Sequence, residues 1–435
     1  MRKLAEDIVK YAKQKGASEA QVSINDGTEF WVEVRNQNIE KLQQANSKNL
    51  TLKIIVNEKV ANASSSDFSL DTLHKLVENA VERAKLASPD TFSSLPENQP
   101  ITVNEKDLQI YDPSIEKISA DDKINIAKRI EKIALSDKRI TVSGGSSYYT
   151  AIGNVVIANS KGFTGTYKYS SVSAGVSLQA GNKDNPVEDY WYESAKYLNG
   201  ISSPEKIAGT AIDRVTRLIG SKKVKTQRVP VVFDRKMASS LLGFLSQCIN
   251  GHSVYMKRSF LAGKIGSKVA ASNIKLIDNG LLPKGLGTSP FDSEGVPSQK
   301  TTLIENGILK NYILDTYSAR KLNLKSTGNA GGSSNLYIET GNYSPEEIIA
   351  SVNNGLFFVR SLGQGTNSTT GDYSKGCYGI WIENGKLAYP VSEITVSGNL
   401  SDMLNNIEML GNDLVFDSSI TSPTLKIKEL TISGV

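Results

Sequence analysis

The residues that could carry out metal chemistry are scarce in this sequence. His74 and His252 are its only histidines, and neither has a histidine partner at helical spacing. A zinc peptidase needs three protein ligands and a general base, so a His-Glu-x-x-His zinc site is excluded. His74 falls between apolar positions of an expected helix, which favours a structural role.

The sequence also has few residues that could form a catalytic nucleophile with its base. Cys248 and His252 are four residues apart, a spacing that suits a metal pair or a thiol–imidazole dyad. Gly251 is expected to end the helix between them, so a buried cysteine followed by a polar residue is the favoured interpretation. A catalytic thiol at Cys377 would need a base, which only two histidines could supply. No Gly-x-Ser-x-Gly elbow follows a buried strand, and no catalytic residue is assigned.

Two glycine-rich segments, Gly328–Ser334 and Gly363–Asn367, could present backbone amides to an anion or to a peptide carbonyl. Neither fits a phosphate loop, because no Gly-Lys-Ser/Thr ending follows and a strand is expected next. Structural turns are the alternative. Carboxylates on neighbouring loops could pin a peptide or simply be solvated. The candidate peptide-binding residues are Asp292, Glu294, Asn329, Gly331, Gly332, Asn367 and Asp372.

Composition and charge narrow the class of protein. The chain has 435 residues, of which 39% are hydrophobic and 22% charged, as in soluble globular proteins. This length predicts roughly two to three domains. The net charge of +5 is weak for so large a surface. The densest basic run, from Lys222 to Arg228, lacks interleaved aromatics, so we interpret it as a solvated linker and expect no direct nucleic-acid binding.

Compartment and cofactors follow from what the sequence lacks. Two cysteines cannot form a disulfide framework and fit a reducing compartment. The charged start has no apolar signal segment, and no run approaches the ~18 apolar residues of a membrane helix. We therefore expect a cytoplasmic protein that binds neither metal, cofactor nor membrane.

Hairpin and helix signals dominate the first region, residues 1–103. Asn-Asp-Gly between alternating strands is a strong hairpin signal, and prolines after residue 88 mark a linker. The expected elements are a helix from Leu4 to Gly16, strands Ala20–Asn25 and Thr28–Arg35 hinged on Asn25-Asp26-Gly27, strands Leu50–Val56 and Lys59–Ala63 joined at Asn57-Glu58, and a helix from Ser69 to Ala87.

Two further regions, residues 104–224 and 225–435, are expected to differ in class. The first should pack against residues 1–103 through a helix at Ser119–Ser136, strands Ile140–Thr150, Ala151–Asn159 and Phe163–Ala180, and a helix from Ser203 to Gly220. The second should be mainly antiparallel β. Its expected elements are a strand Val229–Asp234, a helix Arg235–Asn250, a capped helix at Ser344, and twin hairpins in one sheet at Leu303–Gly307 and Trp381–Gly385.

The fold class predicted from these elements is α+β. Its N-terminal part is expected to be α/β, with helices packed on mixed sheets, and its C-terminal part a mainly antiparallel β unit with few helices.

Several segments together resemble the TldD/PmbA family, whose members were once named modulators of DNA gyrase. The resemblance extends loosely over nearly the whole chain. It is carried by Ala158–Gly162, Ser326–Leu336, Gly363–Asn367, Thr370–Ser374, Trp381–Gly385, Tyr389–Val391, Gly398–Leu400 and Gly411–Leu414.

The resemblance also implies a branch of that family. TldD-like members carry His-Glu-x-x-x-His on a helix and a cysteine near the C-terminus, which together bind zinc. Ser259–Gly266 resembles the segment after that helix, and counting back places the two histidines at Leu242 and Gln247 and the glutamate at Gly243. The stretch Val415–Leu425 has no cysteine. The chain thus resembles the PmbA branch, also called TldE.

The function this implies is a non-catalytic subunit of a peptide-processing assembly. The chain would supply scaffold and peptide-binding surface, and a TldD-like partner would supply zinc for cutting unfolded or extended peptides. A dimer is expected, with that partner or with a second copy. The alternatives are a hydrolase with a non-metal nucleophile and a stand-alone peptide-binding module.

Overall fold

The structure, a computed structural model, describes residues 1–182, 184–363 and 365–435. Its first half is built on one six-stranded sheet in the order β3-β2-β1-β4-β5-β6. The sheet is antiparallel throughout rather than mixed as expected. Its strands are β1 (Glu19–Arg35), β2 (Asn38–Val56), β3 (Lys59–Ser65), β4 (Ile140–Asn159), β5 (Thr164–Asn182) and β6 (Asn185–Ala195).

The predicted hairpin at Asn25-Asp26-Gly27 is wrong. Residues 19–35 form the single strand β1, which pairs with β2 on one side and with β4 on the other. Gly27 lies opposite Gly153 of β4, and a Cβ on Gly27 would lie 2.5 Å from the Ile152 carbonyl oxygen. The glycine thus permits close approach of two strands. The strands predicted as Ile140–Thr150 and Ala151–Asn159 likewise form one strand, β4.

The turn after β1 lies ten residues later, at Asn36-Gln37. Both residues have positive φ, 50° and 63°, as a type I′ turn requires. The first half of β2 that follows is exposed on both faces, so it carries no alternation that could predict a strand. The turn at Asn57-Glu58 is confirmed, with φ values of 48° and 68°.

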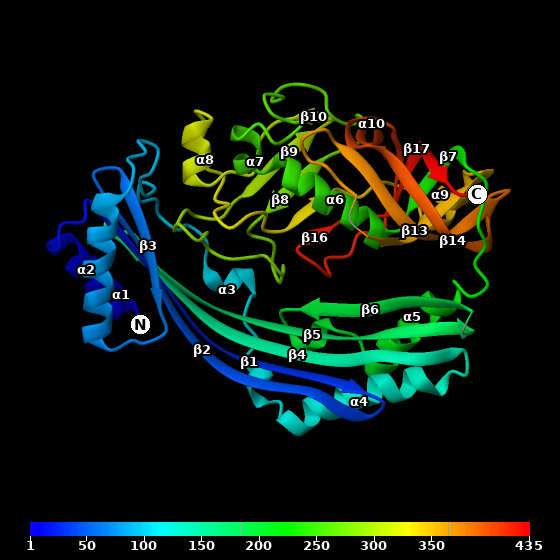
Figure 1. The fold of residues 1–435 in the computed structure, drawn as a ribbon, viewed down its shortest axis with the longest axis horizontal. Coiled ribbons are helices and arrows are strands. Elements are labelled where there is room, and N and C mark those ends of the chain that lie inside the picture. The colour runs from blue at the N-terminus through cyan, green and yellow to red at the C-terminus, as the bar shows by residue number, and fades with distance from the viewer. Residues whose placement is uncertain (183, 364) are drawn as a thin grey trace.

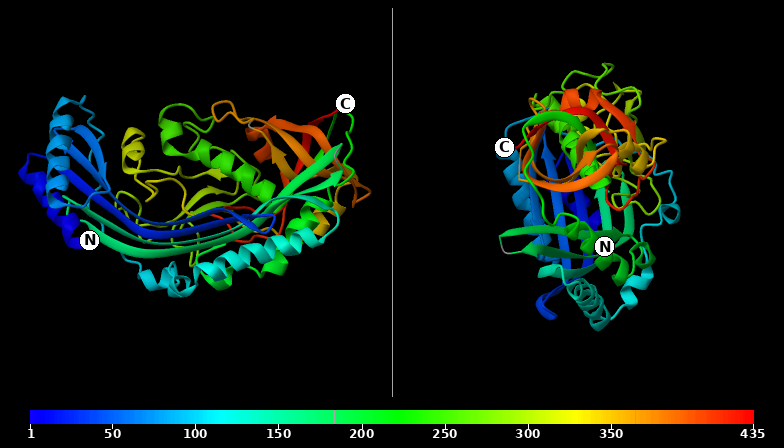
Figure 2. Two further views of the ribbon diagram at one scale, coloured as in Figure 1. Left: turned by 60° about the horizontal axis from the view of Figure 1, so that its bottom comes forward. Right: turned by 90° about the vertical axis from the view of Figure 1, so that its right-hand side faces the viewer.

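Helices cover one face of the sheet, and the other face curves around the C-terminal half (Figures 1 and 2). At the N-terminal end, α1 and α2 pack on Val22, Ile24 and Leu52, while α4 and α5 cover Val32, Val34 and Val172. The predicted helices are confirmed. They are α1 (Arg2–Gln14), α2 (Leu70–Leu86), α4 (Ala120–Ser136) and α5 (Pro204–Thr216), with short turns α3 (Glu105–Leu108), η1 (Pro113–Lys117) and η2 (Leu198–Gly200).

The C-terminal half contains two more sheets, in the orders β10-β9-β8-β11-β16 and β14-β13-β12-β7-β17-β15. A further pairing between β14 and β17 closes the second sheet into a barrel. The strands are β7 (Gln227–Phe233), β8 (Leu276–Asn279), β9 (Lys300–Glu305), β10 (Ile308–Leu309), β11 (Leu336–Ile338), β12 (Asn354–Leu362), β13 (Asp372–Glu383), β14 (Lys386–Asn399), β15 (Ile407–Leu410), β16 (Ile420–Thr421) and β17 (Leu425–Ser433).

Few helices accompany these strands. The longest, α6, packs against strands of both C-terminal sheets (Figure 1). The helices are α6 (Arg235–Ile249), α7 (Gly251–Tyr255), α8 (Thr316–Lys321), α9 (Pro345–Ala350) and α10 (Leu400–Asn405). The capping box at Ser344 is confirmed, because Ser344 Oγ accepts from Glu347 N–H and the Glu347 carboxylate accepts from Ser344 N–H. The α+β class is confirmed.

The twin hairpins form, but they lie in different sheets, which corrects the expectation of one. Asn306-Gly307 joins β9 to β10, and Asn384-Gly385 joins β13 to β14. Each turn has positive φ at both residues, so the local signal was right. Which sheet a hairpin joins depends on distant partners, here β8 for β9 and β12 for β13.

The two halves touch at both ends of the curved sheet. At one end, Val232, Phe357 and Ile380 of the barrel join the core beneath α4 and α5. At the other end, the Arg320 guanidinium donates to the backbone carbonyl oxygens of Phe92, Ser94 and Leu95 at 3.2, 2.6 and 2.9 Å. The C-terminal half therefore spans the concave face. Among the described residues, no helix is long and apolar enough to cross a membrane.

Candidate functional site

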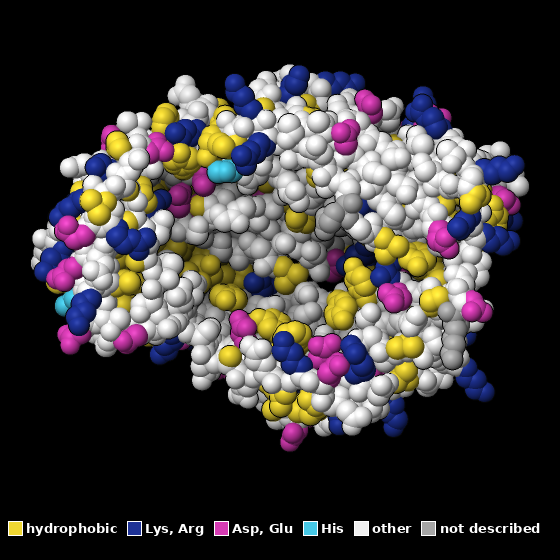
Figure 3. Space-filling model, in the orientation of Figure 1, with side chains coloured by type: hydrophobic (Ala, Val, Ile, Leu, Met, Phe, Trp, Pro, Cys, Tyr) yellow, Lys and Arg dark blue, Asp and Glu magenta, His cyan; other side chains and the backbone are white. Residues whose placement is uncertain are grey.

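A hollow lies between the concave face of the long sheet and the C-terminal half (Figure 3). Within it, a pocket of about 280 Å³ is bounded by the sheet on one side and by two loops, 287–293 and 328–334, on the other. The sheet contributes side chains from β1, β4 and β5, namely Ser23, Asn25, Val155, Ile157 and Tyr167. Four predicted residues, Asp292, Asn329, Gly331 and Gly332, line this pocket.

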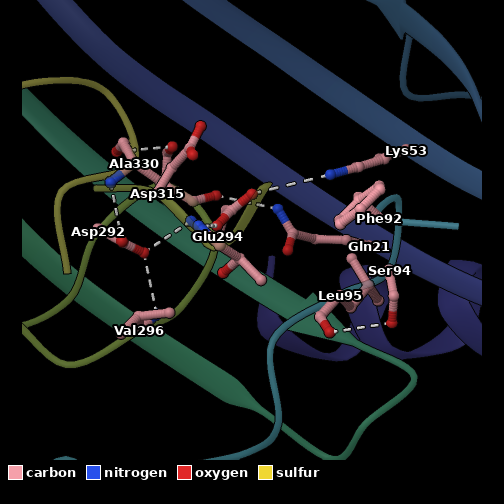
Figure 4. Close-up of polar contacts among 12 residues, drawn as sticks. Gln21, Lys53, Phe92, Ser94, Leu95, Asp292, Glu294, Val296, Asp315 and Ala330 are labelled. Carbon is pink, nitrogen blue, oxygen red and sulfur yellow. Dashed lines mark hydrogen bonds and ion pairs between the residues drawn. The ribbon is translucent and has the colours of Figure 1, made fainter. Parts of the chain in front are cut away.

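Asp292 fastens two loops together instead of offering a free carboxylate (Figure 4). Its Oδ1 accepts from the backbone N–H groups of Glu294 and Val296, and its Oδ2 accepts from that of Ala330, all at 2.9 Å. Burial raises the pKa of Asp292 to about 7, although the three hydrogen bonds favour the charged form. Asp292 therefore sets the position of the glycine-rich loop.

Asn329 is held by a second buried carboxylate, that of Asp278. Its Nδ2 donates to Asp278 Oδ2 at 2.7 Å, and Asp278 Oδ1 accepts from Ser334 N–H at 2.8 Å. Burial raises the pKa of Asp278 to about 6. Asn329 Oδ1 is buried without a hydrogen-bond partner among the described residues. Sequence reasoning missed Asp278, whose only signal was an Asp-Asn-Gly turn after a short strand.

The amides of the glycine-rich loop are largely engaged inside the protein. Those of Ala330 and Ser334 donate to the two carboxylates, and that of Gly332 donates to Asn329 O at 2.9 Å. Gly331 and Gly332 have φ values of 116° and 109°, which favour glycine, and a Cβ on Gly332 would meet no atom within 4 Å. The tip of the loop therefore offers open space at Gly332, and the N–H groups of Gly331 and Ser333 have no acceptor among the described residues.

Glu294 points toward the sheet instead of the pocket (Figure 4). Its Oε2 accepts from Thr316 N–H at 3.0 Å, and its Oε1 lies 3.8 Å from Lys53 Nζ on β2. Next to it, Gln21 Nε2 of β1 donates to Ser293 O at 3.0 Å. These contacts tie the loop to the concave face, so Glu294 helps to join the two halves.

Asn367 and Asp372 lie elsewhere. Both are exposed, Asn367 in the loop between β12 and β13 and Asp372 at the start of β13. Asn367 N–H donates to Asp372 O at 2.9 Å, and Asn399 Nδ2 donates to Asp372 Oδ1 at 3.3 Å. Among the described residues, neither shares a pocket or a hydrogen bond with the Asp292 group. Gln364, within the same predicted glycine-rich segment, lies outside the described residues.

The three positions counted back to the zinc motif lie on α6. Leu242 is 2% exposed and belongs to the main C-terminal core, whereas Gln247 is exposed. Gly243 is half-buried and lines a second pocket, which was not predicted. In the part of the chain that the structure describes, no three His, Cys, Asp or Glu side chains gather as metal ligands.

The two thiols lie in apolar surroundings. Cys248 and Cys377 are both buried, and burial raises the pKa of Cys248 to about 12 and that of Cys377 well above its usual value. Among the described residues no hydrogen bond joins His252 to Cys248: His252 Nδ1 lies 3.1 Å from Tyr255 Oη, and Cys248 Sγ lies 4.0 Å from Ser368 O. This geometry gives neither cysteine the character of a nucleophile.

The chain matches models of a known protein family over most of its length. The PmbA/TldA metallopeptidase models match domain 1 over residues 20–84, the central domain over 113–219 and the C-terminal domain over 226–434. The chain belongs to the PmbA/TldD family. It is 34% identical to Metalloprotease PmbA of Escherichia coli O157:H7, over 100% of this chain and 97% of that protein.

Solved structures of the family share this fold. A candidate modulator of DNA gyrase from Bacteroides thetaiotaomicron superposes with a TM-score of 0.92 at 32% identity, covering 100% of this chain and 98% of the other. TldE from Thermococcus kodakarensis superposes with a TM-score of 0.85 at 22% identity, covering 99% and 100%. The second likeness concerns the fold alone.

Proposed function

We propose that this PmbA/TldD-family chain is a TldE-like, non-catalytic subunit of a metallopeptidase assembly that processes peptides. The observation that supports the proposal is the set of side chains that α6 has at the positions of the zinc motif. Where the family resemblance places histidine, glutamate and histidine, this helix has core Leu242, half-buried Gly243 and exposed Gln247. None of these three side chains supplies the thiolate, imidazole nitrogen or carboxylate oxygen that binds zinc in proteins.

The hollow is the binding surface in this proposal. The antiparallel sheet lines one side of its pocket, and the glycine-rich loop held by Asp292 and Asp278 lines the other. An extended peptide matches this pocket in shape and polarity, because the lining combines backbone, hydroxyl and amide groups with the aromatic rings of Tyr167 and Phe291. The candidate peptide-binding residues remain part of the proposal.

A catalytic partner completes the assembly. We expect a TldD-like chain to pair with this one, or a second copy to use the same surface, and an obligate interface to bury on the order of 2,000 Å² or more. A cytoplasmic location belongs to the same proposal and is supported by two free, buried cysteines.

Co-purification with a TldD-like partner from the same genome tests the proposal. The chain alone should leave unfolded casein intact, the pair should cut it, and a chelator should stop the pair. Light scattering should show the mass of the complex. Cutting by the metal-free chain alone would favour a hydrolase with another nucleophile, and no association with any TldD-like chain would favour a stand-alone binding module.

A further inference from the structure

A second pocket, of about 420 Å³, lies where β6 meets the N-terminal half of α6 and the end of β12. β6 is the last strand of its sheet, and no described strand pairs with its outer edge. The walls combine aromatic rings with hydroxyls, namely Tyr190, Trp191, Tyr192, Ser240, Ser361 and Ser418. The charged side chains in the lining are Asp189, Arg214, Lys236, Arg360 and Asp417.

Arg214 is held by the protein itself through two hydrogen bonds and ion pairs, although its Nε makes no hydrogen bond among the described residues. Its Nε lies 3.1 Å from Asp189 Oδ2, its Nη1 lies 3.4 Å from Asp234 Oδ2, and its Nη2 donates to Val359 O at 3.1 Å. The guanidinium also lies 5.5 Å from the centre of the Trp191 ring. Arg214 therefore holds β6, α5 and β12 together.

Lys236 is only partly neutralised. Its Nζ lies 2.9 Å from Asp417 Oδ2, but Arg235 Nη1 lies 2.8 Å from the same oxygen. One carboxylate thus serves two cations. Lys236 Nζ also lies 5.0 Å from the Trp191 ring centre, which places its remaining donors beside the pocket.

Arg360 is the cation without an adequate partner. Its side chain is 16% exposed, and its nearest carboxylate, that of Glu188, is 3.9 Å away and itself 64% exposed. Among the described residues, Arg360 Nη1 is buried with no hydrogen-bond acceptor. The guanidinium lies 5.8 Å from the centre of the Tyr190 ring and 5.9 Å from that of the Tyr378 ring. Nη1 is enclosed, so an oxyanion in the pocket would contact the exposed remainder of the side chain, whose positive charge only a distant carboxylate offsets.

We propose that this pocket binds a peptide carboxylate, with Arg360 as the principal contact and Lys236 as the second. Three cations and two carboxylates line the pocket and leave one positive charge, which matches a carboxylate and not a doubly charged phosphate. Met237 and Ile420, which are both partly exposed, offer apolar contact to the side chain that carries or precedes the carboxylate. That the guest is a peptide rests on the proposed function, whereas the anion site rests on geometry alone.

Calorimetric titration of the purified chain tests the proposal. The probes are one N-acetylated hexapeptide with a free C-terminus, its C-terminal amide, the amide with one internal aspartate, and inorganic phosphate. The free acid should bind and the plain amide should bind at least tenfold more weakly. Binding of the aspartate-containing amide would identify a side-chain carboxylate as the source, and its failure would identify the C-terminus.

Three variants locate the contact. Arg360→Gln should weaken the acid peptide at least tenfold, since a bidentate guanidinium contact is lost. Ser240→Asp places a repelling charge on an exposed position of the lining, so it tests the pocket even if Arg360→Gln folds poorly. Arg228→Gln, whose side chain is 68% exposed on β7, is the matched control and should change nothing.

Some results would overturn the site. They are equal binding of acid and plain amide, binding of phosphate without binding of either carboxylate probe, or unchanged affinity in both Arg360→Gln and Ser240→Asp. Because the chain is titrated alone, these results are independent of whether a catalytic partner associates with it.

Discussion

Leu242 is buried and Gln247 is exposed on the same helix, so a histidine at each position should change stability by very different amounts. Leu242→His would bury a polar ring at a position that is 2% exposed and should lower the free energy of unfolding by about 2–4 kcal/mol. Gln247→His changes an exposed position and should change it by less than about 0.5 kcal/mol. Urea unfolding measures both. Equal small effects would mean that α6 does not pack Leu242 into the core.

Asp292 makes a prediction about pH. Its pKa in the folded protein, about 7, lies above its ordinary value of 3.8, so between these pH values the folded state binds more protons than the unfolded state. Its contribution to stability is therefore present at pH 4 and is lost as pH rises toward 7, by about 1.4 kcal/mol for each pKa unit at most.

The difference between wild type and Asp292→Asn isolates this effect. The variant should lose the most stability at pH 4–5 and less at pH 7.5, measured as the urea midpoint across that range. Asp372→Asn, which removes an exposed carboxylate outside the pocket, is the matched control, and its pH profile is the baseline for the comparison. A loss in Asp292→Asn that grows with pH would show that hydrogen bonding, and not burial, governs this carboxylate.

The sequence indicated which kinds of residue could bind a peptide, but not which of them lie together in space. Asp292, Asn329 and the two loop glycines do lie together, because the Asp292 carboxylate accepts from Ala330 N–H and so joins the two loops. Asn367 and Asp372 lie apart from them, since their place depends on the β12–β13 pairing, which no local signal specifies. Nothing in the sequence indicated that Arg360 and Trp191 line a pocket, because that pocket forms only where β6, α6 and β12 meet.

Among the elements, Gly27 carries the clearest test. Gly27→Val would bring a Cβ to 2.5 Å from the Ile152 carbonyl oxygen, so β1 and β4 would have to separate at the middle of the sheet. We expect a loss of about 1–3 kcal/mol in thermal or urea unfolding.

A glycine without a close neighbour provides the contrast. A Cβ on Gly209 in α5 meets nothing within 4 Å, so Gly209→Ala should stabilise the protein by up to about 1 kcal/mol. If Gly27→Val were as mild as Gly209→Ala, the close approach of β1 and β4 would not exist in solution.

Local signals predicted elements well where the chemistry is local. The helix starts at Ser119, Ser203 and Ser344 and the turns at Asn57-Glu58, Asn306-Gly307 and Asn384-Gly385 all form. The hairpin at Asn25-Asp26-Gly27 failed because pairing with β2 and β4 on both sides keeps the backbone extended. Tertiary pairing overrode turn propensity there.

At the scale of the whole molecule, the C-terminal half spans the hollow because it is fixed at both ends. The barrel end shares a hydrophobic core with α4 and α5, while the α8 end depends on polar contacts. There, Arg320 donates to three carbonyls of the segment 92–95, Tyr317 Oη donates to Asp90 Oδ2 at 2.6 Å, and Glu19 accepts from Leu95 N–H at 2.7 Å. The sequence showed residues 88–103 only as a proline-rich linker.

This asymmetry predicts that the α8 end can open while the barrel end stays closed. Arg320→Gln removes most of three charge-assisted hydrogen bonds and should lower the opening free energy of residues 88–103 by about 2 kcal/mol, seen as faster backbone hydrogen exchange there. Exchange in β12 should not change. Arg320→Lys keeps the charge but cannot reach three carbonyls at once, so it should resemble Arg320→Gln more than wild type. Full protection in Arg320→Lys would assign the contact to charge alone, and a matching loss of protection in β12 would mean that the two ends open as one unit.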